Sequence, residues 1–93
     1  MVYVYVLSNR TGRLTAGITR HIVRYLQQHR QEVAPSCTHE HQFDRLLLSE
    51  PFRRSADARA RERQINGYTL TEKLGLIRVT NPGFDDLIQT LPP

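Results

Sequence analysis

The sequence predicts one α+β domain over residues 1–93, a small three-stranded antiparallel sheet flanked by helices in the order β-β-α-β-α-α. Three observations carry this prediction: an alternating strand pattern at the N-terminus, a continuous apolar run near the middle, and capping signals before the helical stretches. Ninety-three residues suffice for one small core, and no linker, repeat or low-complexity tract indicates a second.

The first element is a hairpin. Residues 2–7 alternate β-branched and aromatic side chains, which predicts a strand. Turn-forming residues follow at Ser8–Gly12, and Arg13–Ile18 is expected as the partner strand. Thr19 can then accept a hydrogen bond from a first-turn amide and cap a helix whose apolar stripe begins at Ile22.

The middle of the chain predicts a loop, a strand and a second helix. Residues 30–42 are polar and irregular, so we expect a loop. The apolar run Arg45–Glu50 is expected to be a central strand that is covered on both faces and ended by Pro51. Ser55 is expected to cap the next helix, and Gly67 to close it at the C′ position.

Two further capping signals predict short helices in the last third. Thr69 and Glu72 have the spacing of a capping box, in which each side chain accepts a hydrogen bond from the other residue's backbone N–H. Asn81 and Pro82 have the pattern of a cap followed by a first helical residue.

The charge favours an anionic partner. Lysine and arginine number 13 against 9 aspartate and glutamate residues, a net charge of +4, and Lys73 is the only lysine. Because the guanidinium fork matches phosphate oxygens, this use of arginine favours nucleic acid as the partner. A modest positive balance is also typical of soluble proteins that bind no anion, so both interpretations stay open.

The compartment follows from the cysteine count and the N-terminus. Cys37 is the one cysteine, which excludes an intramolecular disulfide and favours a reducing compartment. The opening residues have no basic leader, and their apolar run is too short for a signal peptide or a membrane span. We therefore expect a cytoplasmic protein without a membrane anchor.

Three stretches carry a resemblance to a known family. They are YVYVLSN, which contains Tyr5, TAGIT, which contains Gly17, and the C-terminal ARERQINGYTLTEKLGLIRVTNPGFDDL. Their order and spacing resemble the GIY-YIG nuclease superfamily, in particular its small single-domain bacterial members. The resemblance implies cleavage of a phosphodiester in DNA with one divalent metal ion, Mg²⁺ or Mn²⁺, held by a helix glutamate that lines up with Glu62. It also implies that Tyr5 activates the attacking water.

The resemblance is incomplete at the residues that carry chemistry. The family pattern is matched at Tyr5, Gly17, His29 and Glu62. The second motif tyrosine is replaced by Thr15, and the helix arginine, which neutralises charge on the phosphate, is replaced by Tyr25. The resemblance thus implies a degenerate active site and a weakened or inactive nuclease.

Another arginine could supply the missing charge. Arg24 precedes Tyr25, but adjacent helix residues are rotated by about 100°, so Arg24 points away from the face that Tyr25 and His29 share. Arg13 and Arg20 are candidates that could reach in from neighbouring segments.

Each candidate also has an ordinary structural interpretation. Tyr5 can be a core aromatic, and His29 can complement a helix dipole. Glu62 can belong to an exposed charge ladder, because arginines surround it on the same helix. The arginines expected to contact backbone phosphates are Arg13, Arg20, Arg53, Arg54, Arg59 and Arg63.

Cys37–His41 resembles a zinc cluster but has no second ligand pair, which favours a polar loop.

The sequence therefore leaves two candidate functions open. One is a GIY-YIG-like endonuclease with weak activity. The other is a catalytically inactive module that binds nucleic acid or a protein on the same fold. They differ in whether a guanidinium enters the cleft bounded by Tyr5, Thr15 and Glu62, or whether Tyr25 fills it.

Overall fold

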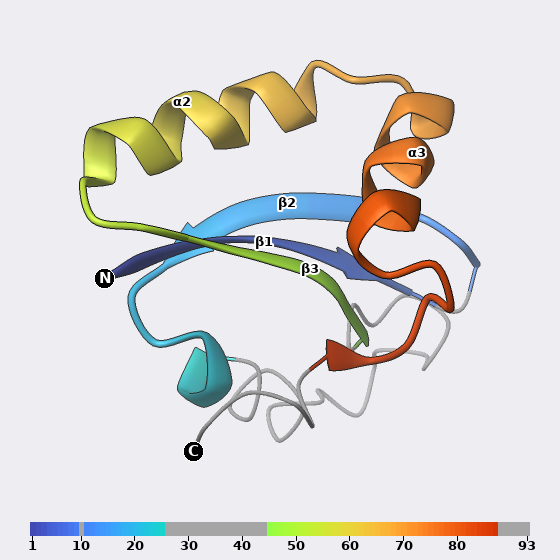
Figure 1. Cartoon of the computed structure of the whole chain (residues 1–93), viewed down its shortest axis with the longest axis horizontal. Helices are drawn as coiled ribbons and strands as arrows, with labels where there is room; N and C mark the ends of the chain where they lie inside the picture. Colours follow the sequence, from blue (N-terminus) through green and yellow to red (C-terminus); the bar gives the residue numbers. More distant parts are fainter. Residues whose placement is uncertain (10, 26–44, 88–93) are drawn as a thin grey trace, which may run out of the picture.

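The computed structural model describes residues 1–9, 11–25 and 45–87, which form an antiparallel sheet with helices on both faces (Figure 1). The sheet contains β1 (Val2–Ser8), β2 (Leu14–Thr19) and β3 (Arg45–Phe52) in the order β2-β1-β3. Helices α2 (Ser55–Asn66) and α3 (Leu70–Thr80) cover one face, and the helical residues 22–25 lie on the other. The predicted α+β fold class is confirmed. No helix of these described residues is long and apolar enough to cross a membrane.

The two faces of the sheet have separate cores. The face under α2 and α3 packs Val2, Val4, Val6, Leu47, Leu48, Ala58, Ile65 and Ile77. The opposite face packs Tyr5, Leu7, Ile22 and Leu46. Because successive strand residues point to opposite faces, β1 supplies valines to the first core and Tyr5 and Leu7 to the second. This alternation puts Tyr5 on the side of residues 22–25.

The hairpin turn forms around a buried asparagine. Asn9 Oδ1 accepts hydrogen bonds from Thr11 N–H at 3.1 Å, Thr11 Oγ1 at 2.8 Å and Arg13 N–H at 2.9 Å. Gly12 has a φ of 86°, which favours glycine. At the far end of β2, the predicted hydrogen bond to Thr19 Oγ1 is present and comes from His21 N–H at 3.2 Å.

The prediction that Arg45–Glu50 is a central strand is wrong, because β1 is central and β3 lies at an edge. The register between β1 and β3 shifts between Val6 and Leu7, where Leu48 pairs with Val6 but Leu46 pairs with Leu7. This bulge adds a residue, so three consecutive leucines are buried although the strand is at the edge. Pro51 lies inside β3 instead of ending it, as an edge strand permits.

Both ends of α2 differ in detail from the prediction, whereas the start of α3 agrees with it. Arg54, and not Ser55, is the N-cap of α2, and it makes no capping hydrogen bond through its side chain. Gly67 ends α2 but has right-handed helical dihedral angles, so the left-handed conformation common at that position is absent. The capping box of Thr69 and Glu72 is confirmed at the start of α3.

Within the described residues, no helix begins at Asn81 as predicted: Asn81 is the C-cap of α3, and a turn follows at residues 82–83. The buried Asn81 Nδ2 donates to Leu47 O at 3.2 Å and Asp85 O at 2.8 Å, while its Oδ1 accepts from Asp85 N–H at 3.1 Å. Its side chain therefore joins the segment after α3 to β3, which explains why the cap pattern misleads. The predicted loop over residues 30–42, His29 and Cys37–His41 lie outside the described residues.

We expect Asn81→Ala to lower the free energy of unfolding by about 2 kcal/mol, because the carbonyl of Leu47 and the N–H of Asp85 would lose their partner. Urea denaturation measures the change. Asn66→Ala removes the same side chain at an exposed position of α2 and should change stability by less than about 0.5 kcal/mol. Equal effects of the two substitutions would contradict the anchoring role of Asn81.

Candidate functional site

The site is built around Tyr5 and a glycine on the next strand. Tyr5 is only 8% exposed, and its Cα is paired across the hairpin with Gly17. A Cβ atom placed on Gly17 would lie 2.6 Å from Cζ of Tyr5 and closer still to its hydroxyl oxygen. The phenol of Tyr5 therefore lies across the backbone of β2 in space that every other amino acid would fill. Gly17 is required here by close approach.

Tyr25 lies against Tyr5 from the helical segment that follows β2. The two ring centroids are 5.4 Å apart, and the ring planes are inclined by 36°. This spacing is within the range of favourable aromatic pairs. The side chains also share a hydrogen bond, and Tyr25 remains 37% exposed. The residue at the predicted arginine position thus contacts Tyr5 directly.

Glu62 lies on α2, which covers the other face of the sheet from the core that contains Tyr5. Ala58 and Ile65 on the same helix are fully buried, and Glu62 is half-buried between them. In the described part of the chain, the Glu62 carboxylate makes no hydrogen bond or ion pair with another side chain. Its negative charge nevertheless raises the pKa of Tyr5. That Glu62 and Tyr5 belong to one site stays a prediction.

The surroundings of Tyr5 keep its phenol neutral. Burial raises the pKa of Tyr5 well above its ordinary value, and the hydrogen bond with Tyr25 and the charge of Glu62 shift that pKa in the same direction. A nearby guanidinium would lower the pKa of Tyr5, whereas burial, Tyr25 and Glu62 all raise it.

Thr15 lies on the same face of the sheet as Tyr5, two residues before Gly17 on β2. It pairs with Leu7 and is half-buried. The hydroxyl is too short to take the place of a tyrosine at this position.

The candidate arginines occupy three different places. Arg24 is exposed and lines a shallow pocket beside Tyr25. Arg20 reaches toward α2, where its Nη2 donates to Ser55 Oγ at 3.4 Å. Arg13 is exposed in the hairpin turn, next to the end of β2 that is farthest from Thr19.

The remaining predicted phosphate contacts lie on α2 and the segment before it. Arg53, Arg54, Arg59 and Arg63 are all exposed.

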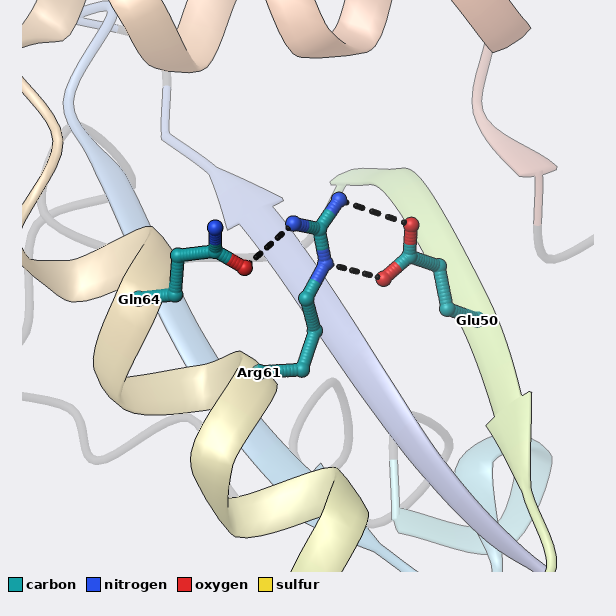
Figure 2. A network of polar contacts seen from close by, with 3 residues as sticks. All are labelled: Glu50, Arg61 and Gln64. Atoms are coloured by element: carbon teal, nitrogen blue, oxygen red, sulfur yellow. Dashed lines mark hydrogen bonds and ion pairs between the residues drawn. The ribbon is translucent and has the colours of Figure 1, made fainter.

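Arg61, next to Glu62 on α2, has a structural partner on β3. Arg61 Nε donates to Glu50 Oε1 at 2.8 Å and its Nη2 to Glu50 Oε2 at 3.2 Å, while Nη1 donates to Gln64 Oε1 at 2.7 Å (Figure 2). This two-pronged ion pair joins α2 to β3. The sequence signal that Arg61 faces the sheet is its spacing from apolar residues. Arg61 follows Ala58 by three residues and precedes Ile65 by four, which places it on the buried stripe of α2.

No group of three histidine, cysteine, aspartate or glutamate side chains converges among residues 1–9, 11–25 and 45–87. A single carboxylate such as that of Glu62 can hold a hard cation such as Mg²⁺, which retains several waters and is commonly held by one or two carboxylates together with substrate phosphate.

A family model described as the GIY-YIG catalytic domain matches residues 1–74 of the 93-residue chain. The match includes all three strands, residues 22–25 and α2. No curated protein and no solved structure matches the chain.

We expect Gly17→Ala to lower the free energy of unfolding by roughly 1–3 kcal/mol, because the new methyl group would displace the Tyr5 ring. Gly75→Ala is the matched control: a Cβ there meets nothing within 4 Å on exposed α3, so the substitution should raise stability by about 0.5–1 kcal/mol. Urea denaturation of both variants measures the difference. Stabilisation by Gly17→Ala would contradict the close approach of Tyr5.

Proposed function

The chain belongs to the GIY-YIG family, and on that premise we propose that it is a divalent-metal-dependent endonuclease domain that cleaves phosphodiester bonds in DNA slowly. The observation that carries the proposal is the match of the GIY-YIG catalytic domain to residues 1–74, and the contact between Tyr5 and Tyr25 is the reason for a low rate. By the resemblance, Tyr5 is the family tyrosine of the first strand and Tyr25 stands at the position of the family's arginine.

Tyr5 is proposed to position the attacking water. Its ring is held by a central strand and by Tyr25, so its hydroxyl has a fixed position. A phenol with a raised pKa stays protonated at neutral pH. It can therefore orient a water molecule by hydrogen bonding, but it is a poor acceptor for the proton of that water. This role supports slow hydrolysis.

Glu62 is proposed to hold the metal ion. Its carboxylate is half-buried on a helix that is fixed to the sheet, and it has no side-chain partner within the described residues. A bound Mg²⁺ or Mn²⁺ would supply positive charge to a phosphate oxygen. Glu62 would hold the metal ion, and with it the positive charge, at α2.

The missing arginine limits the rate. Charge develops on the phosphate oxygens in the transition state, and a fixed donor aimed at them typically contributes about 2.7–4 kcal/mol, a factor of 10²–10³ in rate. Tyr25 can donate one neutral hydrogen bond, which is weaker than a charge-assisted bond. The same substitution therefore leaves the fold intact while removing most of the charge stabilisation.

The substrate is proposed to lie along the exposed arginines near α2. Arg53, Arg54, Arg59 and Arg63 are solvent-exposed, and guanidinium groups bind backbone phosphates without sequence preference. These contacts would make DNA binding sensitive to salt.

A second candidate function is a catalytically inactive module that binds nucleic acid or a protein. It is favoured by the same site, because burial, Tyr25 and Glu62 all raise the pKa of Tyr5. The two candidates share the fold and the basic surface and differ only in turnover.

We expect Tyr25→Arg to raise the rate of DNA cleavage in Mg²⁺ or Mn²⁺ by about 10²-fold, because it restores a cation beside Tyr5. Gel assays with labelled single-stranded, duplex and branched DNA measure the rate. Thr71→Arg, which adds the same charge at an exposed position of α3, is the matched control and should leave the rate unchanged.

Glu62→Gln in the Tyr25→Arg background should abolish cleavage, and cleavage that survives would contradict the metal assignment. If neither the natural chain nor folded Tyr25→Arg cleaves, while salt-sensitive DNA binding persists, the inactive module is the correct function.

A further inference from the structure

We infer that the shallow pocket beside Tyr25 binds one unpaired nucleotide, with its base stacked on the Tyr25 ring and its phosphate paired with Arg24. The inference rests on the proposed function in one respect: it names the form of nucleic acid that the same site accepts. It does not depend on cleavage or on a metal ion.

The pocket lies where β2 leads into the helical residues 22–25. It is lined by Thr19, His21, Arg24 and Tyr25, and its volume is about 280 Å³. That volume is at the small end of ligand pockets, which range over roughly 300–1,000 Å³. The pocket is open and too small for a paired stack of bases, but its size suits a single nucleotide.

Tyr25 supplies a stacking surface that is already held in place. Its ring packs against Tyr5 at 5.4 Å and still has 37% of its surface exposed. An exposed aromatic side chain ordinarily loses rotamer freedom when a ligand binds, and the contact with Tyr5 reduces that cost. Stacking of a base on such a ring contributes about 1–3 kcal/mol and tolerates any base, because every base has a π-face.

The other lining residues have the chemistry that a nucleotide's phosphate and sugar require. Arg24 is exposed, and its guanidinium can bind a phosphate by two parallel hydrogen bonds. Arg24 and Tyr25 are neighbours on a helix and diverge by about 100°, so they flank the pocket instead of overlapping. Thr19 Oγ1 accepts from His21 N–H, and its hydroxyl hydrogen is still available to donate.

The base must be unpaired because of the stacking geometry. In a duplex both faces of each base are covered by its neighbours, so a side chain reaches a face only after the nucleotide leaves the stack. Single-stranded segments expose such faces without that cost, and proteins commonly combine aromatic stacking with arginine contacts to hold them.

The test compares two fluorescein-labelled probes with the full chain, without metal and at low salt. One is the thymidine tetramer T4, and the other is a tetramer of abasic tetrahydrofuran residues with the same phosphates. Fluorescence anisotropy should show that T4 binds roughly 5- to 150-fold more tightly, the factor that corresponds to stacking of one base. Equal affinities for the two probes would overturn the inference.

Variants assign the preference to this pocket. Tyr25→Phe keeps the ring and should keep the preference for T4, whereas Tyr25→Leu should lose it. Arg24→Gln should weaken both probes equally and reduce the salt dependence by about one phosphate contact. Arg45→Gln is the matched control, because Arg45 pairs with Ser8 at the opposite end of the sheet, and it should leave the T4 preference unchanged. If the Tyr25→Leu variant still prefers T4, the base stacks on another residue and the inference is wrong.

Glu62→Gln separates this inference from the proposed function. It should leave the preference for T4 unchanged while abolishing any metal-dependent cleavage. If cleavage is absent from the natural chain but the T4 preference depends on Tyr25, the nucleotide pocket stands and the nuclease proposal fails. If the chain cleaves DNA but has no preference for T4, the nuclease proposal stands and the nucleotide pocket fails.

Discussion

The passage of the Tyr5 ring across Gly17 is the contact on which the rest of the site depends. The Tyr5 phenol occupies the space in which a β2 side chain would stand, and the hairpin register sets that position because the two residues are Cα partners. The ring then provides the surface against which Tyr25 packs. Tyr25 in turn forms one wall of the pocket. A change at Gly17 would therefore affect residues that it does not touch.

The position of α2 depends on contacts along its length more than on its ends. Arg54 caps the helix without a side-chain hydrogen bond, so the N-terminus itself contributes little. Ala58 and Ile65 bury one stripe in the core, and Arg61 joins the helix to Glu50 of β3 (Figure 2). An ion pair with two hydrogen bonds has a defined direction, unlike apolar packing. It thus fixes the rotation of α2 about its axis, and with it the direction of the neighbouring Glu62.

Local patterns predicted the parts of the fold that depend on local chemistry. Strand alternation indicated β1, and the Thr69–Glu72 spacing indicated the start of α3. The edge position of β3 could not be predicted, because a bulge opposite Val6 and Leu7 buries a leucine run that is otherwise typical of a central strand. Asn81 has the pattern of a helix cap, but tertiary hydrogen bonds to Leu47 and Asp85 determine its role.

The same distinction between local patterns and tertiary contacts applies to the candidate site. The resemblance implied that Tyr25 stands at the arginine's position, and the structure has its ring against Tyr5. The spacing of residues on α2 puts Arg61 on the buried stripe but does not identify its partner, since Glu50 lies eleven residues earlier on a strand. The proposed replacement of the family's arginine by Tyr25 would exchange a mobile cation for a rigid ring with an exposed part. The exchange would cost charge stabilisation but not order, because a ring that packs against Tyr5 needs no hydration or ion pairing, whereas a guanidinium must stay hydrated or paired. Stacking of bases is the interaction with nucleic acid that such a ring best provides.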